Sequence, residues 1–135
     1  MAYLKPGTST KVFNELARRV ARVVPLWDVH TLQVARRQSG GQLQEIPVIP
    51  VEVDGSLYIV STRGESDWVR NVRAAGRVGL RQKGDLRDYT VTEVPVAERE
   101  PVITAYRKKA GREVEQYWKQ LPDPADHPLF RLTPA

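Results

Sequence analysis

The 135-residue sequence predicts a mainly β protein with additional helices (α+β), folded as a small split antiparallel β-barrel of about six strands. Two observations support this fold class. Apolar and polar residues alternate in several short runs, and tight turns join those runs into hairpins instead of the strand–helix alternation of a parallel sheet. Closing such a sheet into a barrel also removes the exposed strand edges that promote aggregation.

The first element expected is an amphipathic helix over residues 10–24, because apolar residues recur there at helical spacing and Pro25 ends the pattern. Its other face is basic. Two interpretations remain open: the helix packs on the core, or it makes a peripheral contact with an anionic membrane surface. Its apolar face has few large residues, which favours packing.

Two extended runs follow this helix. Residues 29–36 alternate in the manner of a half-buried strand. Residues 43–53 form a second run, which contains Pro47 and Pro50. Because proline lacks the N–H that a strand interior needs, this run is an edge strand or contains a bulge.

Turn and capping residues place the remaining elements. Asp54-Gly55 predicts a tight hairpin turn into a strand over residues 57–61. A short helix is expected at 66–76, with Ser66 as its N-cap and Gly76 at its end. After it we expect strands 78–83 and 86–94 joined by Gly84-Asp85, helices 98–109 and 112–121, and a closing strand 129–132.

The composition is that of a folded globular domain. Hydrophobic residues make up 41% of the chain and charged residues 27%, and no apolar run reaches the about 18 residues of a membrane span. Because cysteine is absent, disulfides, iron–sulfur clusters and thiolate zinc sites are excluded. We expect residues 1–135 to form one domain, and a cytoplasmic protein, since the N-terminus lacks the apolar core of a secretory signal.

The charge balance favours anionic partners. Lys and Arg total 21 against 16 Asp and Glu, a net charge of +5, which suits phosphate-bearing cofactors, polyanions or acidic lipids. No Rossmann fingerprint, P-loop or serine-hydrolase elbow is found, and we predict no nucleic-acid partner because no nucleic-acid-binding signature is present. His30 and His127 lie far apart in the sequence, so we predict no metal site, and we interpret His30 as a structural residue.

Two loops combine cations, hydroxyls and glycine: residues 36–41 and residues 61–66. The second lies between a strand and the start of a helix, where free N–H groups attract a phosphate or carboxylate. Arg63 and Ser66 would strengthen such a site. In the alternative interpretation Gly64 only forms the turn, Ser66 only caps the helix and Arg63 is solvated.

The motifs around this loop carry a family resemblance. Asp54-Gly55-x-x-Tyr58-x-Val60-Ser61-Thr62-Arg63-Gly64, followed by Asp67-Trp68-Val69-Arg70-Asn71-Val72-Arg73-Ala74, resembles the deazaflavin (F420)-dependent nitroreductase family. Members of that family are split β-barrels related to pyridoxamine-phosphate-oxidase-like flavin-binding proteins. Arg37-Gln38-Ser39-Gly40 and Pro47 are similar to an earlier family segment, and the likeness extends over nearly the whole chain.

The resemblance implies an oxidoreductase, of nitroreductase or quinone reductase type, that transfers a hydride from reduced F420 to a quinone, nitro or enone acceptor. It implies coenzyme F420 as cofactor, with FMN as the alternative. Tyr106 and Tyr117 are the implied catalytic residues, as proton donors or substrate-orienting hydroxyls, and Ser61 or Thr62 is implied to contact the deazaflavin ring. The implied cofactor-binding residues are Arg37, Ser39, Pro47, Ser61, Thr62, Arg63, Gly64, Trp68 and Asn71.

Two departures from the family pattern bear on function. Gln38 stands where the family commonly has Lys, and Gln44-Glu45 stands where it has Arg. The loss of cations leaves two alternatives open: a non-catalytic split barrel that binds F420, FMN, haem or a lipid, and a basic polyanion-binding protein. By analogy with related barrels, a homodimer acting on a small-molecule acceptor is expected.

Overall fold

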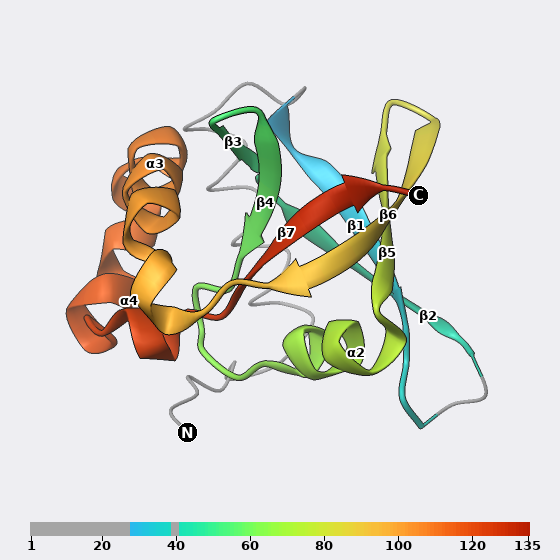
Figure 1. Cartoon of the computed structure of the whole chain (residues 1–135), viewed down its shortest axis with the longest axis horizontal. Coiled ribbons are helices and arrows are strands. Elements are labelled where there is room, and N and C mark those ends of the chain that lie inside the picture. Colours follow the sequence, from blue (N-terminus) through green and yellow to red (C-terminus); the bar gives the residue numbers. More distant parts are fainter. Residues whose placement is uncertain (1–27, 39–40) are drawn as a thin grey trace.

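The computed structural model describes residues 28–38 and 41–135. The helix expected over 10–24 and the predicted site residue Ser39 lie outside these residues. The described residues form seven strands in one antiparallel sheet, with the order β2-β1-β5-β6-β7-β4-β3 (Figure 1). The strands are β1 (His30–Ala35), β2 (Leu43–Val48), β3 (Val51–Val53), β4 (Ser56–Val60), β5 (Arg77–Gln82), β6 (Asp85–Glu93) and β7 (Leu129–Pro134).

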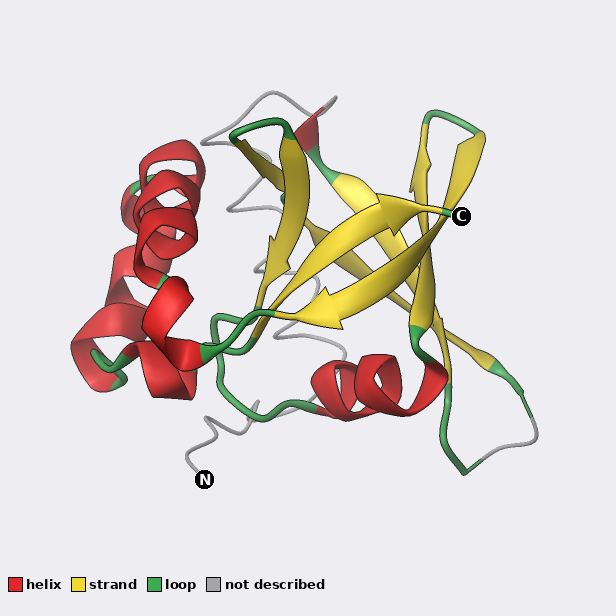
Figure 2. Ribbon diagram, viewed as in Figure 1, coloured by secondary structure: helices red, strands yellow, loops and turns green. Residues whose placement is uncertain are grey.

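The sheet is curled into a half-barrel, which confirms the split-barrel prediction (Figure 2). Strands β2 and β3 are the two opposite edges of the sheet, yet only Ile49 and Pro50 separate them in the chain. The two edges must therefore approach each other at this point. The extended run 43–53 divides here into two strands, which is why the sheet has seven strands and not about six. Pro47 lies on edge strand β2, as its missing N–H requires.

The described helices are α2 (Asp67–Ala75), α3 (Glu100–Ala110) and α4 (Glu115–Gln120), with 3₁₀ turns η2 (Val96–Glu98), η3 (Arg112–Val114) and η4 (Pro124–Asp126). The prediction of a regular helix from residue 112 was wrong in its first turn. Gly111 adopts φ +83° after α3, and a 3₁₀ turn then leads the chain into α4. Within the described residues, no helix is long and apolar enough to cross a membrane.

Two tight turns and one helix end depend on positive φ angles. Asp54 (φ +50°) and Gly55 (φ +81°) form the predicted hairpin turn. Between β5 and β6 the turn residues are Lys83 and Gly84, one position earlier than predicted, because Asp85 already pairs with Gln82 in the sheet. Gly76 ends α2 in the left-handed conformation, as predicted.

Two hydrophobic clusters lie on opposite faces of the sheet. Ile59 and Phe130 point into the curl and pack with Trp68 of α2. Their chain neighbours Val60 and Leu129 face the other way, onto α3 and α4. The alternation of β4 and β7 therefore places α2 on one side and α3–α4 on the other, and the loop after β4 runs between the two helical layers.

Candidate functional site

The loop Ser61–Ser66 connects β4 to α2, and Ser61 fixes its start. The Ser61 N–H donates to the carbonyl of Pro128 at 2.9 Å, and its hydroxyl donates to the carbonyl of Gly64 at 2.7 Å. Gly64 adopts φ +85°, a conformation that glycine adopts without steric cost. The Ser61 hydroxyl is thus used in a hydrogen bond that holds the loop. The next residue, Thr62, is half-buried.

Ser66 does not cap α2 through its side chain, contrary to the prediction. Ser66 is 6% exposed, and its hydroxyl oxygen is buried without a hydrogen-bond partner among the described residues. The backbone N–H of Ser66 donates instead to Gly64 at 2.8 Å. A buried hydroxyl without a partner is costly, so an acceptor or donor atom of a ligand would be stabilised here.

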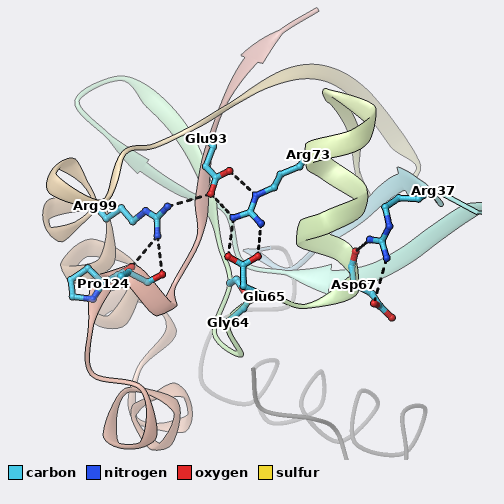
Figure 3. A network of polar contacts seen from close by, with 10 residues as sticks. Arg37, Gly64, Glu65, Asp67, Arg73, Glu93, Arg99 and Pro124 are labelled. Atoms are coloured by element: carbon cyan, nitrogen blue, oxygen red, sulfur yellow. Dashed lines mark hydrogen bonds and ion pairs between the residues drawn. The ribbon is translucent and has the colours of Figure 1, made fainter. Parts of the chain in front are cut away.

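Glu65 is the acidic residue of the loop, and its charge is balanced by arginine. Glu65 is 5% exposed and pairs with both terminal nitrogens of Arg73 (Figure 3). Arg73 also donates to Glu93 through two bonds of 2.7 Å. These bonds, first those to Glu93 and then those to Glu65, raise the pKa of Arg73 above its ordinary value. The negative charge of Glu65 is therefore neutralised, and it would not repel an anion that binds at the loop.

Glu93 extends this network toward the C-terminal segment. The hydrogen bond from Arg73 holds the pKa of Glu93 below its ordinary value. Arg99, which is 5% exposed, lies 3.3 Å from Glu93 and donates to the carbonyl of Pro124 at 3.0 Å (Figure 3). Burial lowers the pKa of Arg99. Sequence reasoning missed this network, because its members come from separate segments of the chain.

Arg63 connects the loop to helix α4. Its Nη2 donates to the hydroxyl of Tyr117 at 3.2 Å, and its guanidinium carbon lies 5.1 Å from the centre of that ring. Tyr117 and Tyr106 are both 6% exposed and belong to one hydrophobic cluster. Burial, and then the neighbouring Tyr117, raise the pKa of Tyr106. The structure therefore brings three of the predicted site residues together.

A second group links α2 to Arg37 and to β2. Asn71 is 4% exposed; its Oδ1 accepts from the backbone N–H of Arg37 at 3.2 Å, and its amide nitrogen donates to Gln44 at 2.7 Å. The Arg37 side chain donates to the carbonyl of Asp67 at 3.2 Å (Figure 3). Gln44 is thus the partner of Asn71. The pairing could not be read from either residue alone.

Trp68 and Pro47 contribute packing. The Trp68 ring is 8% exposed and lies 6.2 Å from that of Phe130, inside the curl of the sheet. Pro47 is half-buried on β2. The predicted site residues therefore do not line one continuous row: Arg37 contacts the first residue of α2, Arg63 precedes that helix in the loop, and Trp68 faces the core.

Two further arginines, Arg73 and Arg81, are engaged in ion pairs. Arg73 pairs with Glu65 and Glu93, and Arg81 lies 2.7 Å from Glu45. Among residues 28–38 and 41–135, no group of three or more His, Asp or Glu side chains is arranged to hold a metal ion.

Comparisons with known proteins bear on family and fold. A family model described as F420H2-dependent quinone reductase matches residues 7–122. A solved structure described as an F420-H2-dependent reductase is 20% identical, with a TM-score of 0.59, covering 78% of this chain and 94% of that chain. None of the curated protein sequences matches significantly.

Two further solved structures share the fold. One, described as a domain-swapped dimer, is 17% identical with a TM-score of 0.60, covering 93% of this chain and 100% of that chain. An FAD-binding protein from Mesorhizobium loti is 17% identical with a TM-score of 0.54, covering 95% and 91%. At these identities the likeness establishes the split-barrel fold.

Proposed function

The chain belongs to the F420H2-dependent quinone reductase family, whose cofactor is coenzyme F420, and we propose that its loop Ser61–Ser66 holds the anionic tail of that coenzyme. The bound coenzyme then serves the reduction of a small electrophile: a quinone, a nitro compound or an activated enone. Arg63 and Arg37 are the proposed cations of the site, and Tyr106 and Tyr117 face the acceptor.

The observation that carries the proposal is the hydroxyl of Ser66. It is buried without a partner in the described chain, at the N-terminus of the nine-residue helix α2. Helix N-termini carry a partial positive charge and free N–H groups, which favour phosphate and carboxylate. An anionic oxygen bound beside Ser66 would satisfy its hydroxyl and gain from the helix end at the same time.

The surrounding charges fit an anion. Arg37 reaches the start of α2 through the carbonyl of Asp67, and its ion pair with the Asp67 carboxylate is long, at 3.9 Å, with that side chain 78% exposed. Such an exposed pair contributes little, so Arg37 can turn to a ligand at small cost. Glu65 is neutralised by Arg73 and does not repel the tail.

Bound in its reduced form, the coenzyme supplies a hydride, and the protein supplies orientation and a proton. The hydroxyl of Tyr117 accepts a hydrogen bond from Arg63, so its own proton is available to an acceptor oxygen. Tyr106 stays protonated over a wide pH range because burial raises its pKa. Both hydroxyls can therefore orient a carbonyl or nitro oxygen and stabilise negative charge that develops there.

A pair of serine variants tests the cofactor site. Ser66→Ala removes a hydroxyl that has no partner in the described chain, so the melting temperature should stay unchanged or rise while the F420 dissociation constant increases about threefold to tenfold. Ser56→Ala, at the far end of β4, is the matched control and should alter neither binding nor turnover. Fluorescence polarisation of F420 gives the affinity.

Turnover separates an enzyme from a binding protein. Mixing the protein with reduced F420 and menadione should reoxidise the coenzyme. Binding without reoxidation of F420 by any of several quinone, nitro and enone acceptors would identify a non-catalytic F420 carrier. Tight binding of FMN with no binding of F420 at micromolar protein would contradict the proposed site.

The proposal takes residues 1–135 as one domain and includes a homodimer. A solved structure of the same fold is described as a domain-swapped dimer, which supports this state. Light scattering after size exclusion gives the mass directly, and a 15.3 kDa species at all concentrations would contradict the dimer.

A further inference from the structure

His127 lies between η4 and β7 and is fully buried, at 0% exposure. Its Nδ1 is 2.9 Å from the carbonyl oxygen of Ser61, and its Nε2 is 2.6 Å from the carbonyl oxygen of Leu121. The imidazole stacks on the ring of Trp118, with centroids 4.1 Å apart and planes 12° apart. Two distant backbone segments therefore converge on one side chain.

The chemistry of the two contacts defines the ring. Carbonyl oxygens accept hydrogen bonds and cannot donate, so each nitrogen must donate. A neutral imidazole carries a single N–H, whereas the imidazolium carries two. A buried cation is costly unless it is hydrogen-bonded, and here two charge-assisted hydrogen bonds and the face of an indole ring surround it.

We propose that His127, protonated on both ring nitrogens, is a positioning residue that clamps the Ser61–Ser66 loop to the end of helix α4. What that loop binds rests on the proposed function; the clamp itself rests on the contacts of His127. The N–H and the hydroxyl of Ser61 are already hydrogen-bonded, and His127 binds its remaining polar group, the carbonyl oxygen. All the polar groups of Ser61 are therefore fixed.

The other end of the clamp reaches the acceptor side of the site. Leu121 follows α4, and its N–H donates to the carbonyl of Tyr117 at 2.8 Å. The Tyr117 hydroxyl in turn accepts from Arg63, which returns the chain of contacts to the loop. These contacts form a closed ring that runs through Ser61, His127, Leu121, Tyr117 and Arg63. Within this ring, His127 sets the distance between the Ser61–Ser66 loop and helix α4.

Two substitutions divide the clamp into its halves. The amide nitrogen of asparagine can take the place of Nδ1, and that of glutamine the place of Nε2, so each variant retains one donor. His127→Asn should keep the bond to Ser61 and bind F420 within about threefold of the native affinity, whereas His127→Gln should weaken binding about tenfold. A uniform loss of packing would affect both variants alike.

Two measurements need no coenzyme. Nitrogen-edited NMR of the native protein should show two nitrogen-bound protons on the His127 ring. Hydrogen exchange at the amides of Gly64, Glu65 and Ser66 should be faster in His127→Gln than in His127→Asn. His30→Gln, at a half-buried histidine whose Nδ1 lies 3.3 Å from the carbonyl of Asp28, is the control and should change neither loop exchange nor affinity.

The outcomes are separable. A single ring N–H in the native protein, or equal loop exchange in the Asn and Gln variants, overturns the clamp whatever the loop binds. Absence of F420 binding by the native protein overturns the proposed function and leaves these two measurements to decide the clamp. If neither variant folds, the native NMR spectrum still decides it.

Discussion

The guanidinium of Arg63 lies over Tyr117, with its carbon 5.1 Å from the ring centre and its Nη2 donating to the phenol oxygen at 3.2 Å. This contact joins the loop that precedes α2 to helix α4. It places the proposed cation of the coenzyme site against the proposed hydroxyl of the acceptor site. The proposed coenzyme site and the proposed acceptor site are therefore direct neighbours at this contact.

Arg63→Ala should weaken F420 binding by about tenfold or more, because a charge-assisted contact to an anion is lost. The melting temperature should change little, since the contact with Tyr117 is partly exposed. Arg131→Ala, an exposed arginine on β7, removes the same charge elsewhere and should leave the affinity within about twofold. Equal losses in the two variants would mean that only net charge attracts the coenzyme.

Tyr117→Phe and Tyr106→Phe should each lower kcat by about tenfold to a hundredfold and spare F420 affinity, because a hydroxyl that serves the acceptor acts in the transition state. Because burial raises the pKa of Tyr106, its contribution should persist above about pH 10, where ordinary tyrosines ionise. Single-turnover oxidation of reduced F420 measures both effects. An unchanged kcat in both variants would assign the two rings to packing alone.

Local patterns predicted most of the elements. Asp54-Gly55 and Gly76 were placed correctly because tight turns and helix ends require particular backbone angles, which few residues adopt. The alternation of Leu32 and Val34 likewise predicted a strand with one buried face. The division of the run 43–53 was missed, since Pro47 and Pro50 indicate an edge without showing that the two halves lie on opposite edges.

The site was only partly predictable for a physical reason. The hydrogen bond from Asn71 to Gln44 and the contacts of His127 join segments whose proximity is set by the curled sheet and not by neighbouring residues. Charge type, loop position and the family resemblance made Arg63 and Gly64 candidates for the site, and this assignment stays a prediction. The absence of a side-chain cap at Ser66 among the described residues could not be foreseen, because serine is a favourable N-cap in isolation.

Arg73→Ala should lower the free energy of unfolding by about 2–3 kcal/mol, because it leaves Glu65 buried without its partner. Arg73→Ala combined with Glu65→Gln should recover part of this loss, since a neutral amide is less costly to bury than a charge. Urea unfolding of the single and double variants gives the coupling. If the double variant is as unstable as the sum of its single variants, the pair does not act as a unit.

The acid stability of the protein should depend on Glu93. In the folded protein the hydrogen bond from Arg73 lowers the pKa of Glu93 below its ordinary value of 4.5. The ionised carboxylate therefore stabilises the fold fully above pH 4.5. The stabilisation is lost as the pH falls through the lower, folded pKa. The difference in unfolding free energy between the native protein and Glu93→Gln should therefore shrink below about pH 4.5. A difference that is constant with pH would show that Glu93 is not held ionised by Arg73.

Asn71→Ala should disconnect the start of β2 from α2. The variant removes the acceptor of the Arg37 N–H and the donor to Gln44 while leaving the charge of Arg37 in place. We expect a loss of about 1–3 kcal/mol in stability, because partly buried polar groups lose their partners. F420 affinity should fall less than in Arg63→Ala, since the cations remain. Gln44→Ala removes only the bond between Asn71 and Gln44 and should lower the stability about half as much. If Gln44→Ala is as unstable as Asn71→Ala, the whole stabilisation comes from the Asn71–Gln44 bond.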